Sequence, residues 1–261
     1  MNAPRYNSLD SAQVKSRKHG VRMLGRITKC WLFTYRAPEA EIRKYVPEPL
    51  EPVTFGGFGF WNMVACEVSQ LRPWPLPAIA GIRYQHIAYR IHVRAPGFSH
   101  PDQMGEPEGL YFLRSDCDSA LIHRAGNLMT DLKLHRSKIT LPSANQRGFI
   151  RLQGDQPAEI EVDPMLKPEL SWLSPFDSVS EAASFLKYKP MALSPNGQGG
   201  VRAMRINREE SDWKAKPIGV RFADWSYLPD DLNSGLEVCY AVDPIDYDWT
   251  RSVDLIRSGR F

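Results

Sequence analysis

Residues 84–94, with the sequence YQHIAYRIHVR, alternate polar with apolar side chains almost without a break. Side chains on a β-strand point alternately to opposite faces, so the pattern predicts a strand with two different faces. The face suited to packing holds Gln85, Ile87, Tyr89, Ile91 and Val93. The opposite face holds His86, Ala88, Arg90 and His92. Two imidazoles and a guanidinium in a row are unusual on a strand, and we interpret this face as one wall of a polar cavity. A solvated outer face of an antiparallel sheet would explain the same alternation.

The composition limits the classes of protein to which the chain can belong. Of its 261 residues 43% are hydrophobic, which is enough for a packed core and too many for a disordered chain. The net charge of +3 is too small and too dispersed for a nucleic-acid-binding surface. No apolar run approaches the roughly 20 residues that a membrane-spanning helix needs, and the N-terminus lacks the apolar core of a secretory signal. We therefore expect a cytoplasmic protein with neither nucleic acid nor membrane as partner.

The cysteines and the loop motifs give no sign of a cofactor. No two of the four cysteines have metal-ligand spacing, which predicts buried free thiols in a reducing compartment: Cys30, Cys66, Cys117 and Cys239. No Gly-rich phosphate loop, nucleophile elbow or nucleotide-binding pattern occurs. We expect no bound cofactor and no metal.

Local patterns predict many strands and three short helices. Further strands are expected at residues 26–36, 55–68, 109–115, 128–141, 200–208, 219–225 and 236–243, with a hairpin at 149–162. Helices are expected at 38–46, at 120–125 with Gly126 as a C-terminal stop, and at 181–187 behind a capping box of Ser178 and Glu181. Residues 190–200 are predicted to be a loop. The absence of a strong linker favours one domain, residues 21–261, of α+β or mainly-β type behind a polar tail or arm at 1–20.

One segment resembles a known family. Residues 35–51, YRAPEAEIRKYVPEPLE, are similar to the opening of acetoacetate decarboxylases, with a near-identical Arg-Lys-x-Val-Pro-Glu-Pro-Leu-Glu. The order of elements fits over residues 26–141. Two later strands look more like an uncharacterised bacterial branch of that superfamily. Its Phe-x-Glu-x-Asn-x-Arg-Thr-Tyr-Val is matched by Tyr84, His86, Ala88, Arg90 and Val93. Its Gly-Val-Tyr-Phe-Leu-Ser-Leu-Asp-Ala is matched by residues 109–117.

The resemblance implies a fold and leaves the activity open. It implies a mainly antiparallel, closed, cone-like β-barrel with a solvent-restricted central cavity and a few short helices, and it points to a homo-oligomer. It does not by itself imply decarboxylation.

The departures from the decarboxylases concern their chemistry. In those enzymes the helix ends in Arg-Glu, and four residues later Pro-Lys-Lys follows, whose first lysine forms the Schiff base. Here Arg124 is kept, but Ala125 replaces the glutamate, and the Pro-Lys-Lys places are occupied by Thr130, Asp131 and Leu132. The usual Schiff-base lysine is therefore missing from its position. Two acidic residues expected from the resemblance are also missing. His86 replaces the acid on the strand 84–94, and Phe60, Trp61 and Asn62 stand where an acid is expected on the apolar strand after the Pro-Glu-Pro motif.

Three enzymatic hypotheses remain. Lys133, two residues beyond Asp131, would face the same cavity as a displaced nucleophile, although Asp131 would raise its pKa and keep it charged. Alternatively, Asp131 and His86 act as base and acid on a small carboxylate held by Arg90, whose planar fork suits a carboxylate. A metal site would use His86, His92, His135 and Asp131.

Structural roles compete with these hypotheses. The histidines would then be hydrogen-bonded structural groups, and Arg90 and Asp131 would form a buried ion pair. Our sequence-based prediction is a lyase or isomerase for a small, keto-acid-like organic acid, with acid–base residues instead of the usual lysine. Its catalytic candidates are His86, Asp131 and Lys133, and its substrate-binding candidates are Arg90, Arg124, Trp61 and Tyr84. The alternative is a non-catalytic barrel that binds a small molecule between Trp61, Tyr84 and Trp74.

Overall fold

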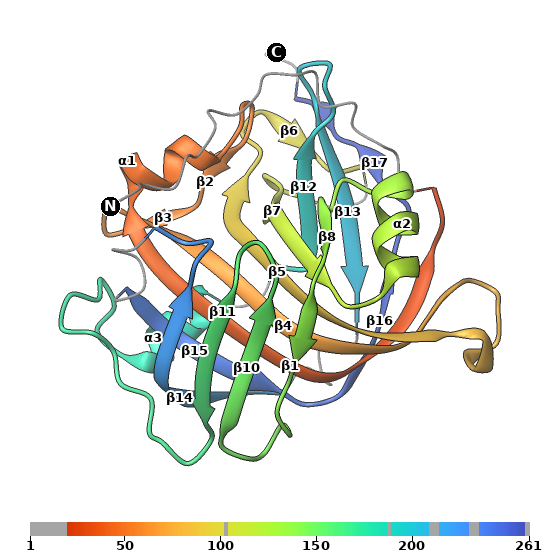
Figure 1. Ribbon diagram of the computed structural model, residues 1–261. Helices are drawn as coiled ribbons and strands as arrows, with labels where there is room; N and C mark the ends of the chain where they lie inside the picture. Colours follow the sequence, from red (N-terminus) through yellow and green to blue (C-terminus); the bar gives the residue numbers. More distant parts are fainter. Residues whose placement is uncertain (1–19, 102–103, 187–188, 209–213, 230–234, 259–261) are drawn as a thin grey trace.

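The computed structural model describes residues 20–101, 104–186, 189–208, 214–229 and 235–258. These residues form one large, mostly antiparallel sheet and a two-stranded one, with a few short helices around them (Figure 1). Parallel pairing occurs where β7 meets β8 and β12. No helix of the described chain is long and apolar enough to cross a membrane. The predicted tail lies outside the described residues except for Gly20.

Seven strands follow one another in a circuit of hydrogen-bonded pairs. They are β1 (Met23–Pro38), β4 (Phe58–Pro73), β5 (Ile82–Arg94), β7 (Glu108–Cys117), β12 (Met191–Pro195), β13 (Val201–Asn207) and β16 (Ile245–Trp249). Each pairs with the next, and β16 pairs again with β1. The long β1 changes partners along its length, because its first part pairs with β16 and its second with β15 (Leu236–Val242). We call these seven strands the ring.

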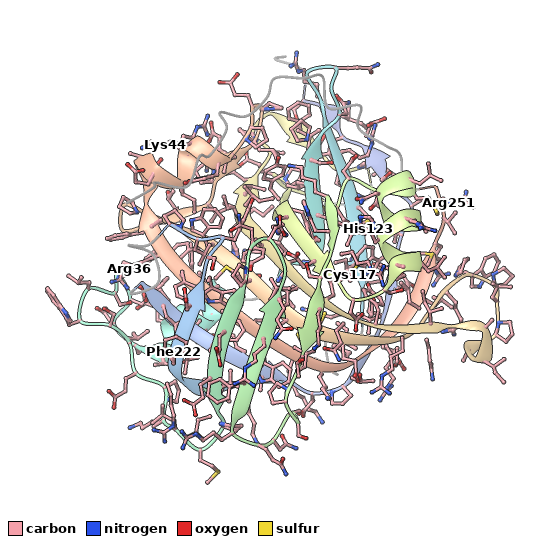
Figure 2. All side chains as sticks on the ribbon, viewed as in Figure 1. Arg36, Lys44, Cys117, His123, Phe222 and Arg251 are labelled. Atoms are coloured by element: carbon pink, nitrogen blue, oxygen red, sulfur yellow. The ribbon has the colours of Figure 1, made fainter. Side chains whose placement is uncertain are left out.

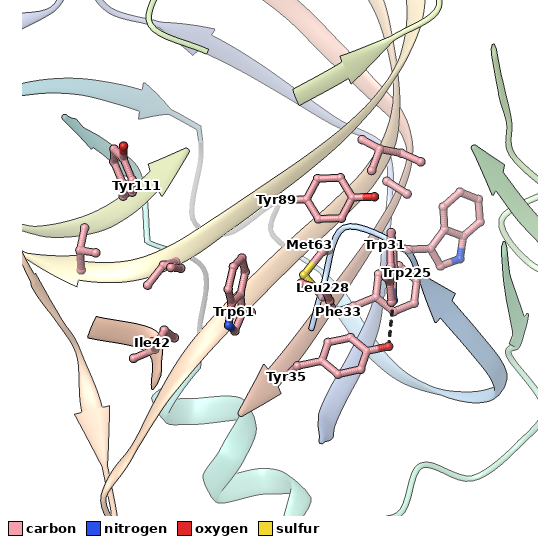
Figure 3. Packing of buried hydrophobic residues seen from close by; sticks show 14 of the residues in the cluster. Trp31, Phe33, Tyr35, Ile42, Trp61, Met63, Tyr89, Tyr111, Trp225 and Leu228 are labelled. Carbon is pink, nitrogen blue, oxygen red and sulfur yellow. Dashed lines mark hydrogen bonds between the residues drawn. The ribbon is translucent and has the colours of Figure 1, made fainter. Parts of the chain in front are cut away.

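A second layer packs on the outer face of β1, β4 and β5. It consists of β9 (Lys138–Thr140), β10 (Gly148–Gln153), β11 (Ala158–Asp163) and β14 (Ala215–Trp225) (Figure 1). Large side chains join the two layers, and among them Trp31, Phe33, Tyr89 and Trp225 are fully buried. Trp225 Nε1 donates a hydrogen bond of 3.0 Å to the hydroxyl of Tyr35 (Figure 3). This core buries the apolar face of β5 that the sequence predicted.

The other face of the ring strands is also buried. There a second cluster contains Leu32, Val64, Ala88 and Phe112. On this face of β5, His86 is 5% exposed, so the alternative of a solvated outer face is wrong. The strand is buried on both sides.

Two helices pack near the strands of the ring. Helix α3 (Val179–Phe185) has the predicted N-terminal cap, because Ser178 Oγ accepts a hydrogen bond from the Glu181 backbone N–H, but it begins two residues before the predicted start at 181. Phe185 of this helix contacts the ring of Phe60 on β4. Helix α2 (Ala120–Met129) follows β7, with Cys117 at the end of that strand beside the helix start (Figure 2). The remaining helical segments are short: α1 (Glu39–Ile42), continued by a turn of 3₁₀ helix at Arg43–Tyr45, and a 3₁₀ turn at Ala78–Ala80.

Several sequence-based boundaries were wrong. Helix α2 does not stop at Gly126 but continues through it to Met129. The glycine instead permits close packing, since a Cβ there would lie 2.1 Å from Leu134 Cδ1. Within the predicted strand at 128–141, only Leu134–Arg136 (β8) and Lys138–Thr140 (β9) are strands. The predicted loop at 190–200 contains β12, and β16 was missed.

The minor strands complete the sheets. They are β2 (Glu51–Pro52), β3 (Thr54–Phe55), β6 (Phe98–Ser99), β17 (Val253–Asp254) and β18 (Ile256–Arg257). The cis peptide bonds of the described chain precede Pro49 and Pro75.

Candidate functional site

A cavity lies inside the ring, lined by side chains from β1, β4, β5, β7, β13 and β16 and by Arg208 after β13. We call it the ring cavity. The space open to the centre of a water molecule is about 60 Å³. Most of its wall is apolar, with residues such as Ile27, Leu32, Val64 and Phe112. The wall is interrupted by a few polar groups, and these define its chemistry.

Four side chains, three of which line the ring cavity, are paired in register across neighbouring strands. Cys30 on β1 is the register partner of Cys66 on β4, which in turn faces His86 on β5. His86 is also the partner of Cys117 on β7. Cys30, Cys66 and His86 line the ring cavity. All four cysteines of the chain are buried and free, as predicted.

Arg90 lies four residues beyond His86 on the same face of β5. It is 3% exposed, and its guanidinium donates hydrogen bonds to Asn62 on β4, to the side-chain Oδ1 and to the backbone oxygen. Asn62 Nδ2 donates in turn to Thr34 Oγ1 on β1 at 3.3 Å. The guanidinium carbon lies 5.6 Å from the centre of the Phe112 ring. These contacts across β1, β4, β5 and β7 hold a buried positive charge in the wall of the cavity.

Burial sets the protonation of the other groups. It lowers the pKa of His86 to about 4, with the nearby Arg90 charge adding to the effect. His86 Nε2 has no hydrogen-bond partner among the described residues. Burial raises the pKa of Cys66 to about 12 and that of Tyr84 further above its usual value. At neutral pH the imidazole is therefore neutral, the thiols are protonated, and the cavity's charge is carried by its arginines.

The acid–base pair expected from the sequence is not assembled. His86, Arg90 and Tyr84 line the ring cavity, but Asp131 does not. Asp131 lies in the turn after α2, where its Oδ2 is 3.9 Å from a terminal nitrogen of Arg202. The expected ion pair with Arg90 is thus replaced by this contact of Asp131 with Arg202.

Lys133 lies outside the cavity as well. Its backbone φ of +49° belongs to the left-handed region and not to a strand. Its side chain is exposed, and Nζ donates a hydrogen bond of 3.1 Å to the hydroxyl of Tyr111. The expectation that Lys133 faces the cavity is therefore wrong, because the helix and turn before it break the alternation on which it rested.

The remaining candidates are scattered. Trp61 is fully buried on the opposite face of β4, against the ring of Tyr45 at 5.0 Å. Arg124 lies on the exposed side of α2, and Trp74 is 58% exposed, so neither forms a cavity wall. His92 is 1% exposed, and burial lowers its pKa to about 3.

The hypothetical metal ligands His86, His92, His135 and Asp131 do not come together. Within the described part of the chain, no three His, Cys, Asp or Glu side chains are placed to hold a metal ion.

Sequence reasoning missed part of the lining. Arg208 follows β13, and Ile245, Tyr247 and Trp249 alternate along β16. The sequence IDYDW at 245–249 carries a recognisable alternation of large apolar and acidic residues. Arg208 stands beyond the last strand residue and has no comparable signal.

Comparisons with solved structures define the class of fold. An acetoacetate decarboxylase-like enzyme from Sphingomonas wittichii RW1 superposes with a TM-score of 0.59 at 12% identity, over 91% of this chain and 93% of that one. The acetoacetate decarboxylase of Legionella pneumophila gives 0.56 at 13% identity, over 98% and 92%. The enduracididine biosynthesis enzyme MppR, solved in complex with pyruvate, gives 0.52 at 13% identity, over 96% and 95%. The fold is therefore acetoacetate decarboxylase-like, as the sequence resemblance predicted.

Residues 26–233 match the model of the family DUF2071, described as uncharacterized conserved protein (COG2071). The chain belongs to this family. No curated protein sequence matches it significantly.

Proposed function

We propose that the protein binds a small organic acid in the ring cavity, with the carboxylate held by Arg90. The observation that carries this proposal is a buried guanidinium in the wall of an otherwise mostly apolar cavity. Arg208 adds a second positive charge, and no Asp or Glu is found among the described residues that line the space. Taking a charge out of water costs several kcal/mol. An anionic ligand would offset that cost, and the planar fork of Arg90 matches a carboxylate.

The volume restricts what fits beside Arg90. A water molecule needs about 10–15 Å³ on this measure, so about 60 Å³ has room for roughly four to six water-sized groups. That space suits a carboxylate with a short organic body. We propose that the ring of paired strands is a closed, cone-like barrel around this ligand, since its pairings return to β1.

Turnover is the second candidate function. A neutral imidazole can take a proton from a carbon next to a carbonyl group, and His86 Nε2 is buried in the cavity wall with no hydrogen-bond partner in the described part of the chain. This supports a lyase or isomerase that acts on a keto-acid-like ligand, with His86 as the proton acceptor and Arg90 holding the anion. Asp131 has no place in this version, and no lysine is found among the described lining residues. Binding therefore rests on more observations than catalysis does.

Calorimetry with pyruvate and propanoate tests binding. In Arg90→Met the side chain keeps its approximate volume and loses its charge, and we expect binding to be lost while the circular dichroism spectrum is retained. Arg90→Lys keeps a charge without the fork and should bind weakly. Arg94→Met is the matched control, because Arg94 lies on the same strand and pairs with Glu51 outside the cavity. Unchanged binding in Arg90→Met would refute the proposal.

Catalysis has a separate test. Proton NMR in D₂O follows exchange of the hydrogens next to the keto group of 2-oxobutanoate. We expect protein-dependent exchange that His86→Gln abolishes and that His123→Gln on α2 does not. If the protein binds the acid but causes no exchange, it is a binding protein.

The cellular setting is also a proposal. Four free thiols favour a reducing compartment, and we propose the cytoplasm. A homo-oligomer stays a prediction, which light scattering after size-exclusion chromatography would check.

A further inference from the structure

A second chamber adjoins the ring cavity beneath helix α2. It is lined from the helix by Ile122, Ala125 and Met129, and its volume on the same measure is about 80 Å³. Tyr84 and Trp249 line both spaces, so these two aromatic side chains stand where one chamber meets the other. We call this second space the helix chamber.

The two chambers differ in charge. The ring cavity contains Arg90 and Arg208. The described residues that line the helix chamber include no Lys, Arg, His, Asp or Glu, and its polar atoms are few, such as the hydroxyl groups of Tyr84 and Thr130. A molecule that occupied both spaces would therefore meet positive charge at one end and apolar side chains at the other.

The order of residues along β5 gives the direction. Tyr84, at the junction, is two residues before His86 on the same face, which corresponds to about 7 Å along a strand. Arg90 lies four residues beyond His86 on the same face of β5, and both line the ring cavity, so the charged end of the cavity lies on the far side of His86 from Tyr84. A ligand whose carboxylate contacts Arg90 therefore extends its tail past His86 towards Tyr84 and the junction of the two chambers.

We infer that the ligand is an amphipathic monocarboxylic acid whose unbranched apolar tail extends past Tyr84 and Trp249 into the helix chamber. This rests on the proposed function, because the same Arg90 holds the carboxylate. The two chambers together accommodate on the order of ten water-sized groups. Octanoate, with eight carbons and two oxygens, is a probe of that size.

A chain-length series on the unmodified protein tests the inference. Calorimetry compares propanoate, pentanoate and octanoate with 1-octanol, which has the tail of octanoate without its charge. Burial of one methylene group tightens binding by about threefold to fourfold. We expect affinity to rise by about that factor per methylene up to octanoate and 1-octanol to bind at least tenfold more weakly than octanoate.

A variant that fills the helix chamber isolates the tail. In Ala125→Phe the new ring occupies that space, and we expect octanoate to lose at least tenfold in affinity while propanoate is unaffected. Ala125→Leu is a milder version in case the larger side chain disturbs the fold. Leu121→Phe is the control on the same helix, since Leu121 is 60% exposed and lines neither chamber.

The possible failures are distinguishable. If propanoate, pentanoate and octanoate all bind in an Arg90-dependent way but with equal affinity, the tail is not buried and the inference is overturned, while the proposed function stands. If 1-octanol binds as tightly as octanoate, the charged end is not used and the inference also falls. If no acid binds, the proposed function and this inference fail together.

Discussion

Replacing Asn62 by aspartate changes the charge next to Arg90 with almost no change in shape. Asn62 Oδ1 already accepts a hydrogen bond from the guanidinium, and an aspartate oxygen can accept the same bond. The substitution therefore turns a neutral partner into a buried negative one. We expect it to weaken the binding of any organic acid and to raise the pKa of His86 from about 4, because Arg90 contributes to holding that pKa low.

The magnitude follows from Coulomb's law. Two carboxylates on opposite edges of one guanidinium lie about 6 Å apart, and at an effective dielectric constant of about 20 they repel each other by about 3 kcal/mol. This corresponds to a loss of about a hundredfold in affinity. The stability of the protein should change much less, because the gain from the new ion pair is offset by the cost of burying the carboxylate.

Calorimetry with propanoate or octanoate measures the first effect, and NMR titration of the His86 ring protons measures the second. Gln70→Glu adds the same charge at an exposed position of the same strand, and it should leave both readings unchanged. Unweakened acid binding in Asn62→Asp would show that the carboxylate does not lie at Arg90. An unmoved His86 pKa would show that Arg90 does not set the field in the cavity.

Three further predictions follow from the fold. Burial lowers the pKa of His86 to about 4 and that of His92 to about 3, so below about pH 6.5 the unfolded chain binds more protons than the folded protein. Each histidine should therefore reduce the free energy of unfolding by about 1.4 kcal/mol per pH unit as the pH falls from about 6.5 to the pKa of that histidine in the folded protein. Urea unfolding at several pH values should show that the free energy of unfolding of His92→Asn falls less steeply with decreasing pH than that of the unmodified protein. An equal dependence on pH would contradict the burial of His92. Gly109→Ala brings a Cβ to 2.6 Å from a backbone oxygen of β12 and should cost about 1–3 kcal/mol in urea unfolding, whereas Gly20→Ala, with open space around it, should cost little. Borohydride reduction with acetoacetate should leave Lys133 unmodified in peptide mass spectra, because its side chain is exposed and lies outside the ring cavity in which we place the ligand; an adduct there would contradict its placement.

The strand at the centre of the site was predictable because its information is local. Alternation alone shows to which face of the strand each side chain points, so the sequence around His86 and Arg90 predicts that they share a face. Whether that face lies in solvent or in a cavity cannot be predicted from the local sequence. It depends on strands such as β13 and β16, which come more than a hundred residues later and close over it.

The same reasoning failed for Asp131 and Lys133 for a physical reason. The alternation over residues 128–141 predicts a strand. Tertiary contacts instead favour a longer helix α2, which ends at Met129, followed by a turn. The Asn127 side chain donates to the Leu134 backbone oxygen and accepts from the Leu134 backbone N–H, which fastens the end of α2 to the start of β8. Gly126 allows the packing that this requires, and neither effect appears in a periodicity.

No lysine is found among the described residues that line the ring cavity, and the charge of the cavity bears on what the other lining groups can do. In Schiff-base enzymes a neighbouring cation or desolvation lowers the pKa of the amine so that it can act as a nucleophile. Both conditions are present in this ring cavity, but the group that experiences them is the imidazole of His86, whose pKa falls because of burial and Arg90. An imidazole made neutral in this way forms no imine with a keto acid. Because the described residues that line the cavity include Arg90 and His86 but no lysine, we favour binding of an organic acid, with proton transfer as its chemical extension, over covalent catalysis.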